Sequence, residues 1–247
     1  MEKSPPTLRG SAITHNANQV RSRSWRLAIL PLLLAACSGD RCGAPASPPV
    51  AAADSVLLEP AAAAFKEVPP DTFFVALETN EGAITLEIIR AWAPMGAYRF
   101  YNLVRNGFYD GSRFFRVLPG FVAQFGVNGH PAIDAAWSDQ QIPDDPVLTS
   151  NLGGTITYAM AGPGSRVTQV FINYRDNPGL DTQGFAPFGR VVAGGGTLLR
   201  LNAEYGEPQP LGAGPSWECM QDGGNAYLAE RFDRLDYVER ARIVERP

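Results

Sequence analysis

An arginine and a glutamine within an apolar stretch are the residues with the clearest chemical potential. Arg116 and Gln124 lie among the aromatic and aliphatic side chains of the segment from Arg113 to Gly126. This combination places a few hydrogen-bonding groups in an apolar groove, an arrangement typical of a binding site. Taken alone, an arginine between aromatic residues is more often a packed or ion-paired surface residue. The assignment therefore depends on the rest of the pattern.

Residue types that support other chemistries are scarce. His15 and His130 are the only histidines, which argues against a multi-histidine metal centre and leaves a Ser/His/Asp triad with one candidate. Cys37, Cys42 and Cys219 form no CxxC motif, and a disulfide between Cys42 and Cys219 would require an oxidising compartment. We expect no metal and no cofactor.

Charge and loop composition argue against further classes of function. The net charge is −4 and only two lysines are present, which disfavours nucleic-acid binding. Paired carboxylates in a proline-containing stretch leave glycoside hydrolysis open, although a solvated loop is the favoured interpretation. These carboxylates are Asp134, Asp139, Asp144 and Asp145. Gly194–Gly196 lacks the Lys-Ser/Thr of a phosphate loop and predicts a turn.

The elements that must position Arg116 are mostly strands. Alternating apolar residues over Ala83–Ile88 predict a half-buried strand that pairs with Phe73–Glu78 across a short turn. Helices are expected from Pro94 to just before Gly107 and near Thr197. The further predicted strands are Phe114–Leu118, Gly120–Phe125, Thr155–Met160, Thr168–Asn173, Phe185–Val192 and Leu235–Val244. The fold class is therefore mainly β, and we expect a closed antiparallel barrel capped by two helices.

The segment around Arg116 resembles the signature of the cyclophilin-type peptidyl-prolyl cis-trans isomerases. The match runs in order from about Phe73 to Leu201. It includes Arg113–Gly126, Ala159–Pro163, Thr168–Ile172, Leu180–Asp181 and Phe185–Gly189. An ordered series of motifs is far more specific than an isolated one. The family's capped antiparallel barrel agrees with the predicted elements.

The resemblance implies roles by position. Arg116 corresponds to the catalytic arginine, and Gln124 to the polar partner of an apolar proline pocket. The implied peptide-binding residues are Phe121, Val122, Gln124, Ala159, Met160, Ala161, Gln169, Phe171, Leu180 and Phe185. The implied substrate is an X-Pro bond in a polypeptide, and rotating it requires loss of amide resonance over a barrier of about 18–20 kcal/mol. A fixed guanidinium that donates to the prolyl nitrogen of the twisted amide would lower that barrier without a general base.

Several positions depart from the family pattern. Phe115 stands where histidine is common, Val122 where methionine is usual and Met160 where asparagine is usual. Gly179 replaces a frequent tryptophan, and Phe185 occupies the approximate place of a rim histidine. Since Val122 keeps the pocket apolar and Met160 still offers its backbone, we expect isomerisation to persist. Loss of the indole at Gly179 predicts weak binding of cyclosporin-type inhibitors.

The N-terminus has the order of an export signal. Arginines precede the apolar run Leu27–Ala36, which is too short to span a bilayer, and Leu34–Cys37 resembles a bacterial lipoprotein signal with Cys37 as lipid acceptor. The alternative is cleavage near Ala36 without lipidation. We therefore expect a signal peptide over 1–36, an Ala/Pro-rich linker over 37–70 and an isomerase domain over 71–247.

Together these patterns predict a monomeric peptidyl-prolyl cis-trans isomerase of the bacterial cell envelope, attached to a membrane by its N-terminal lipid. Its partners would be proline-containing polypeptides, as folding clients. The alternative is a peptide-binding or chaperone module of the same fold that holds client chains without turnover. The segment 202–234, which contains Cys219, has no function that the sequence reveals.

Overall fold

The computed structural model describes Met1, residues 42–43 and residues 47–247. The chain divides into two units, Met1–Gly39 and Asp40–Pro247, and the second contains every helix and strand reported below. The lipidation candidate Cys37 lies outside the described residues. No helix in the described part of the chain is long and apolar enough to cross a membrane.

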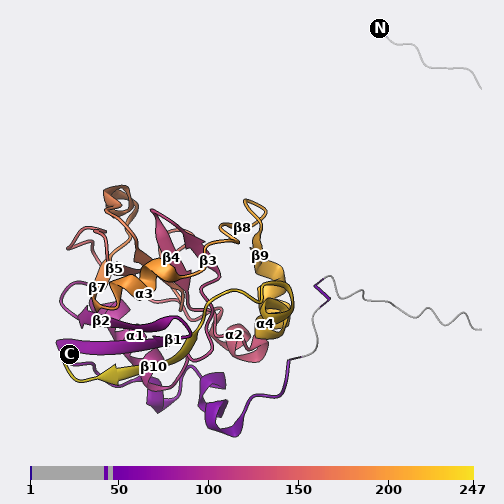
Figure 1. Ribbon diagram of the computed structural model, residues 1–247, viewed down its shortest axis with the longest axis horizontal. Helices are drawn as coiled ribbons and strands as arrows, with labels where there is room; N and C mark the ends of the chain where they lie inside the picture. The colour runs from indigo at the N-terminus through magenta and orange to yellow at the C-terminus, as the bar shows by residue number, and fades with distance from the viewer. Residues whose placement is uncertain (2–41, 44–46) are drawn as a thin grey trace, which may run out of the picture. The chain divides into compact units, whose positions relative to one another are not determined.

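A curled antiparallel sheet of eight strands forms the centre of the domain in residues 47–247, with the order β10-β1-β2-β7-β5-β6-β4-β3. Figure 1 shows the last strand, β10, beside the first strand, β1. The strands are β1 (Thr72–Thr79), β2 (Gly82–Ile89), β3 (Arg116–Leu118), β4 (Val122–Phe125), β5 (Thr155–Tyr158), β6 (Val170–Asn173), β7 (Pro187–Ala193) and β10 (Val238–Val244). The predicted opening hairpin is confirmed, with Thr79 paired to Gly82.

The prediction of a closed barrel is wrong, because the edge strands β3 and β10 do not pair as a ladder. The chain before β3 makes only an isolated bridge, Arg113 to Tyr237, and a few backbone bonds such as Phe114 N–H to the Asp236 carbonyl at 2.9 Å. With only three residues, β3 is too short to extend this contact along β10. The sheet is therefore a curled half-barrel.

Both predicted helices are present. The helix α1 (Pro94–Arg105) starts at a proline, and its buried face, which includes Phe100 and Leu103, packs against β7 and β10. The helix α3 (Gly195–Arg200) packs against β2. The hydrophobic core between these elements is aromatic: the ring centroids of Phe100 and Phe188 are 5.1 Å apart.

Two further helices, α2 (Pro131–Trp137) and α4 (Trp217–Arg231), were not predicted. They pack against each other (Figure 1). The sequence of α4 hides its helical character because Gly224 lies within it and has φ 52°, ψ −140°. A small parallel pair, β8 (Pro208–Gln209) and β9 (Gly214–Ser216), precedes α4. Short 3₁₀ helices occur at η1 (Ala52–Leu58), η2 (Ala63–Phe65) and η3 (Pro178–Gln183).

Residues 47–70 were expected to be an extended spacer, but they pack on the domain. Leu57 and Phe65 are buried in the main hydrophobic core, and the Trp137 indole N–H donates to the Leu57 carbonyl at 2.8 Å. The apolar side chains within the Ala/Pro-rich composition provide this attachment. The disulfide between Cys42, which precedes this segment, and Cys219 attaches the chain to α4.

Candidate functional site

Three of the predicted site residues lie in a row across the sheet. Arg116 on β3 pairs with Gln124 on β4, and Gln124 pairs with Phe171 on β6. Directly paired residues of antiparallel strands point to the same face, so these side chains share one surface. The Gln124 side chain connects Arg116 with Gln169. It accepts from Arg116 Nη1 at 3.2 Å and donates to Gln169 Oε1 at 3.0 Å.

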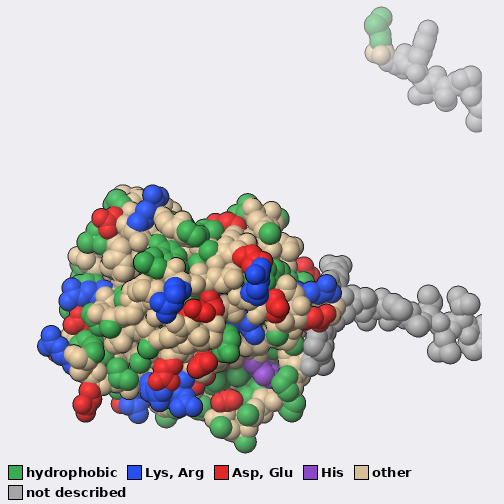
Figure 2. Space-filling model, viewed as in Figure 1, with side chains coloured by type: hydrophobic (Ala, Val, Ile, Leu, Met, Phe, Trp, Pro, Cys, Tyr) green, Lys and Arg blue, Asp and Glu red, His purple; other side chains and the backbone are tan. Residues whose placement is uncertain are grey.

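A cavity of about 590 Å³ lies beside this row. Six of the predicted site residues line it: Arg116, Gln124, Ala159, Met160, Ala161 and Gln169. The other lining residues include Phe115, Val167, Trp217 and the segment Glu207–Leu211. Figure 2 shows the surface of the domain hollowed between the part that carries η3 and the part that carries β8 and β9. The Arg116 side chain is 22% exposed, so it reaches solvent.

The other five predicted residues lie outside the cavity lining, and one of them, Phe121, contacts Arg116. The Phe121 ring centroid is 5.6 Å from Arg116 Cζ. Val122 and Phe171 are buried, and the Phe171 and Phe185 rings are 5.8 Å apart at their centroids. Phe185 N–H donates to the Leu180 carbonyl at 3.2 Å, which fixes both at the end of η3. Six of the eleven predicted residues therefore line one cavity, and the other five connect to them through β4, β6 and the ring contact between Phe171 and Phe185.

The positions that depart from the family pattern have distinct surroundings. Phe115 is buried in a second cluster with Tyr227, Leu228 and Phe232, so it connects the cavity wall to α4. Gly179 is exposed, and a Cβ placed there would meet nothing within 4 Å. The site therefore has no large side chain at this position of its rim.

Glu207 is the residue in contact with Arg116 that the sequence did not predict. Its carboxylate accepts from Arg116 Nε at 2.7 Å and from Nη2 at 2.6 Å. The hydrogen bond from Arg116 is the largest cause that lowers the pKa of Glu207 below its usual value, and burial opposes it. Glu207 lies beyond Leu201, where the motifs noted in the sequence end, and no local pattern connects it with Arg116, which is 91 residues earlier.

Three of the four aspartates that left glycoside hydrolysis open make contacts that stabilise the fold. Asp145 is buried, accepts from the Met95 and Gly96 N–H groups at the start of α1, and pairs with Arg166 at 3.0 Å. Asp144 also pairs with Arg166, at 3.2 Å. These carboxylates cap a helix and neutralise a buried arginine, whose side chain is 2% exposed.

Asp134 has a similar structural role. It accepts from the Asn128 and Gly129 N–H groups at 2.8 and 2.9 Å, and burial raises its pKa to about 6. His130 is half-buried and is the N-cap of α2, and its Nε2 lies 2.7 Å from the Pro48 carbonyl. Neither residue lines the cavity beside Arg116.

Comparison with known proteins agrees with this geometry. Peptidyl-prolyl cis-trans isomerase-like 1 of Gibberella zeae is 34% identical over 51% of this chain and 80% of its own length. The peptidyl-prolyl cis-trans isomerase of Acinetobacter baylyi is 34% identical over 49% of this chain and 66% of its own length. The crystal structure of a cyclophilin type peptidyl-prolyl cis-trans isomerase from Cryptosporidium parvum shares the fold, with a TM-score of 0.52 at 19% identity over 71% of this chain and 99% of its own.

The match to a whole family covers more than half of the chain. Residues 74–211 match the family described as cyclophilin type peptidyl-prolyl cis-trans isomerase/CLD. This range contains the Arg116 row, the cavity lining from Phe115 to Leu211 and Glu207. The chain therefore belongs to the cyclophilin-type peptidyl-prolyl cis-trans isomerases.

Proposed function

We propose that the cavity beside Arg116 binds proline-containing segments of unfolded or flexible proteins, and that Arg116 catalyses rotation about their X-Pro bonds. One observation carries this assignment. Arg116 lies at the wall of the cavity with its side chain partly exposed, between an aromatic ring and the amide of Gln124. A hydrogen-bond donor at this place contacts the prolyl nitrogen of a bound peptide. No covalent step is needed.

The electronic change during rotation explains why an arginine suits this role. In a planar amide the nitrogen lone pair is delocalised, and twisting the X-Pro bond restores it as a hydrogen-bond acceptor. A donor that bonds the twisted amide more strongly than either planar form lowers the barrier. The guanidinium remains charged throughout the accessible pH range and needs no proton transfer. The apolar side chains around it limit the access of water to the planar amide.

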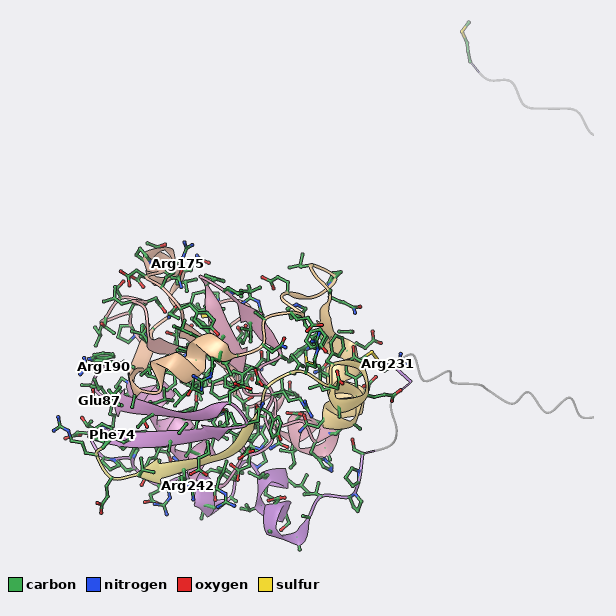
Figure 3. All side chains as sticks on the ribbon, in the orientation of Figure 1. Phe74, Glu87, Arg175, Arg190, Arg231 and Arg242 are labelled. Carbon is green, nitrogen blue, oxygen red and sulfur yellow. A yellow bond between two sulfur atoms is a disulfide. The ribbon has the colours of Figure 1, made fainter. Side chains whose placement is uncertain are left out.

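The Arg116→Ala variant tests the assignment. Removing a preorganised donor should lower kcat/KM on an X-Pro peptide by about 100-fold, while the affinity for the planar peptide changes little. Arg190→Ala is the matched control, because Arg190 pairs with Glu87 on neighbouring strands at the left of Figure 3, away from β8 and β9. The control should retain the activity of the original chain.

Two results would overturn the assignment. Equal acceleration of a proline-limited refolding reaction by the original chain and by Arg116→Ala would show that Arg116 is not the catalyst. Peptide binding without any acceleration by the original chain would instead identify a peptide-binding module of the same fold.

The proposal also includes a location in the bacterial cell envelope, with attachment through a lipid on Cys37 and a monomeric domain. The apolar run Leu27–Ala36 followed by Cys37 supports export and lipidation. The disulfide between Cys42 and Cys219 supports an oxidising compartment. Mass spectrometry of the mature N-terminus should find a diacylated Cys37, and Cys37→Ser should abolish it. An unmodified N-terminus elsewhere would refute the anchor.

A further inference from the structure

The Glu207 carboxylate binds one edge of the Arg116 guanidinium. A guanidinium has five N–H donors. Glu207 takes the Nε donor and one Nη2 donor, and Gln124 takes one Nη1 donor. Within the described chain nothing accepts from the two N–H groups that remain on Nη1 and Nη2. The guanidinium is therefore held along one side and retains free donors for a ligand in the cavity.

The backbone at Glu207 is fixed by a compact turn. Its carbonyl accepts from Gly214 N–H at 2.8 Å where β8 and β9 meet. A Cβ at Gly212 or Gly214 would lie 2.4 or 2.7 Å from the same oxygen, so only glycine allows this approach. The turn is thus built tightly around the residue that carries the carboxylate.

Both ends of the segment that contains Glu207 are attached to the rest of the domain. On one side, the Tyr205 ring packs against Phe232 with centroids 5.1 Å apart. On the other side, Ser216 N–H donates to the Tyr227 hydroxyl at 3.2 Å, and Cys219 is bonded to Cys42. Figures 1 and 3 show β8 and β9 directly before α4 in this part of the domain. A carboxylate on such a segment has a defined position rather than a range of positions.

We propose that Glu207 is the positioning residue for Arg116: its two-point hydrogen bond sets the plane of the guanidinium so that the free Nη donors face the prolyl nitrogen. An arginine side chain loses conformational entropy when it is held in one geometry. In this protein that ordering is complete before substrate arrives, because the carboxylate and guanidinium form a bidentate pair. The role rests on the proposed catalysis by Arg116.

Glu207→Ala and Glu207→Gln test the role in the full chain. Loss of orientation should lower kcat by about tenfold in the Ala variant, and less in the Gln variant, which keeps one acceptor. KM should stay within about twofold, because the planar peptide does not depend on the orientation of Arg116. Glu204→Gln is the matched control, since Glu204 lies in the same segment and pairs with Arg234 instead. It should change neither constant.

A spectroscopic measurement separates positioning from a general loss of structure. The Nε–H resonance of Arg116, assigned by its disappearance in Arg116→Lys, should exchange slowly with solvent in the original chain and quickly in Glu207→Ala. In Glu207→Ala, the backbone amide resonances outside the segment 202–217 should be unchanged. Faster exchange together with unaltered kcat would show that orientation by Glu207 is irrelevant to catalysis.

An increase in kcat for Glu207→Ala would also overturn the proposal, and it would show that the carboxylate competes with substrate for Arg116. Failure of the proposed function gives a different result. In that case Arg116→Ala retains full activity, whatever the behaviour of the Glu207 variants.

Discussion

The guanidinium of Arg116 contacts a carboxylate, an amide and an aromatic ring at the same time. Glu207 and Gln124 satisfy three of its donors, and Phe121 lies 5.6 Å from its Cζ. Each contact restricts a different motion of the side chain, and none removes its charge. At the scale of single residues, the site is therefore a positively charged donor fixed in orientation against an apolar surface.

Asp134 provides a prediction about pH at this scale. Burial raises its pKa to about 6 in the folded protein, from 3.8, so the folded state binds this proton more tightly than the unfolded state. The resulting contribution to stability is fully present below pH 3.8 and is lost as the pH rises through 6. The free energy of unfolding should therefore fall by about 3 kcal/mol from this group between these limits.

The Asp134→Asn variant isolates this contribution, because an amide does not titrate. Urea unfolding of both proteins between pH 4 and pH 7 should show the original chain losing stability relative to the variant as the pH rises. A constant difference between the two proteins over this range would show that Asp134 has an ordinary pKa.

At the scale of elements, tightly packed backbone turns hold α4 against the loop before α2. Gly224 interrupts α4 and brings it against the loop before α2, where a Cβ would lie 2.2 Å from the Gly129 carbonyl oxygen. The Asn225 N–H donates to that same oxygen at 2.7 Å. This contact joins α4 to the part of the domain that precedes α2.

Gly224→Ala should therefore destabilise the protein by about 2–4 kcal/mol, because the left-handed conformation and the backbone contact both exclude a side chain. Gly195→Ala is the control: it lies in α3, has no positive φ, and a Cβ there meets nothing within 4 Å. Alanine at Gly195 should be neutral or slightly stabilising in urea unfolding. A similar small effect at both positions would refute the proposed packing at Gly224.

At the scale of the whole molecule, the chain is connected by a covalent bond between distant segments. The Cys42–Cys219 disulfide spans 177 residues, and Leu57 and Phe65 of the same N-terminal segment are buried in the core. A chain that began at Pro70 would lack these contacts. Studies of activity should therefore use the protein with residues 42–70 present.

Reduction of this disulfide should lower the free energy of unfolding by about 3–5 kcal/mol, because the bond restricts a very long loop of the unfolded chain. Chemical denaturation with and without a reductant measures the change, and Cys42→Ser should reproduce the reduced value. The variant provides the control, since a reductant should have no further effect on it. If reduction leaves the unfolding midpoint unchanged, the bond does not stabilise the fold.

Local patterns in the sequence were sufficient for the first hairpin, for α1 and for the position of Arg116. The reason is that period-two alternation, a proline at a helix start and an ordered series of motifs are all readable within short windows. The same windows missed α4, since glycine at 223 and 224 interrupts its helical pattern. They also predicted an extended spacer where Leu57 and Phe65 are buried.

Only the tertiary structure decided what meets across the fold. It showed the open edge between β3 and β10, and it placed Glu207 on Arg116 across 91 residues of chain. It also confirmed the disulfide between Cys42 and Cys219, which the sequence had left open. Such contacts depend on the path of the whole chain in space, and neither partner carries a local signal of the other. Residue types therefore indicated the chemistry of this protein, while the packing of distant segments determined how its arginine is held.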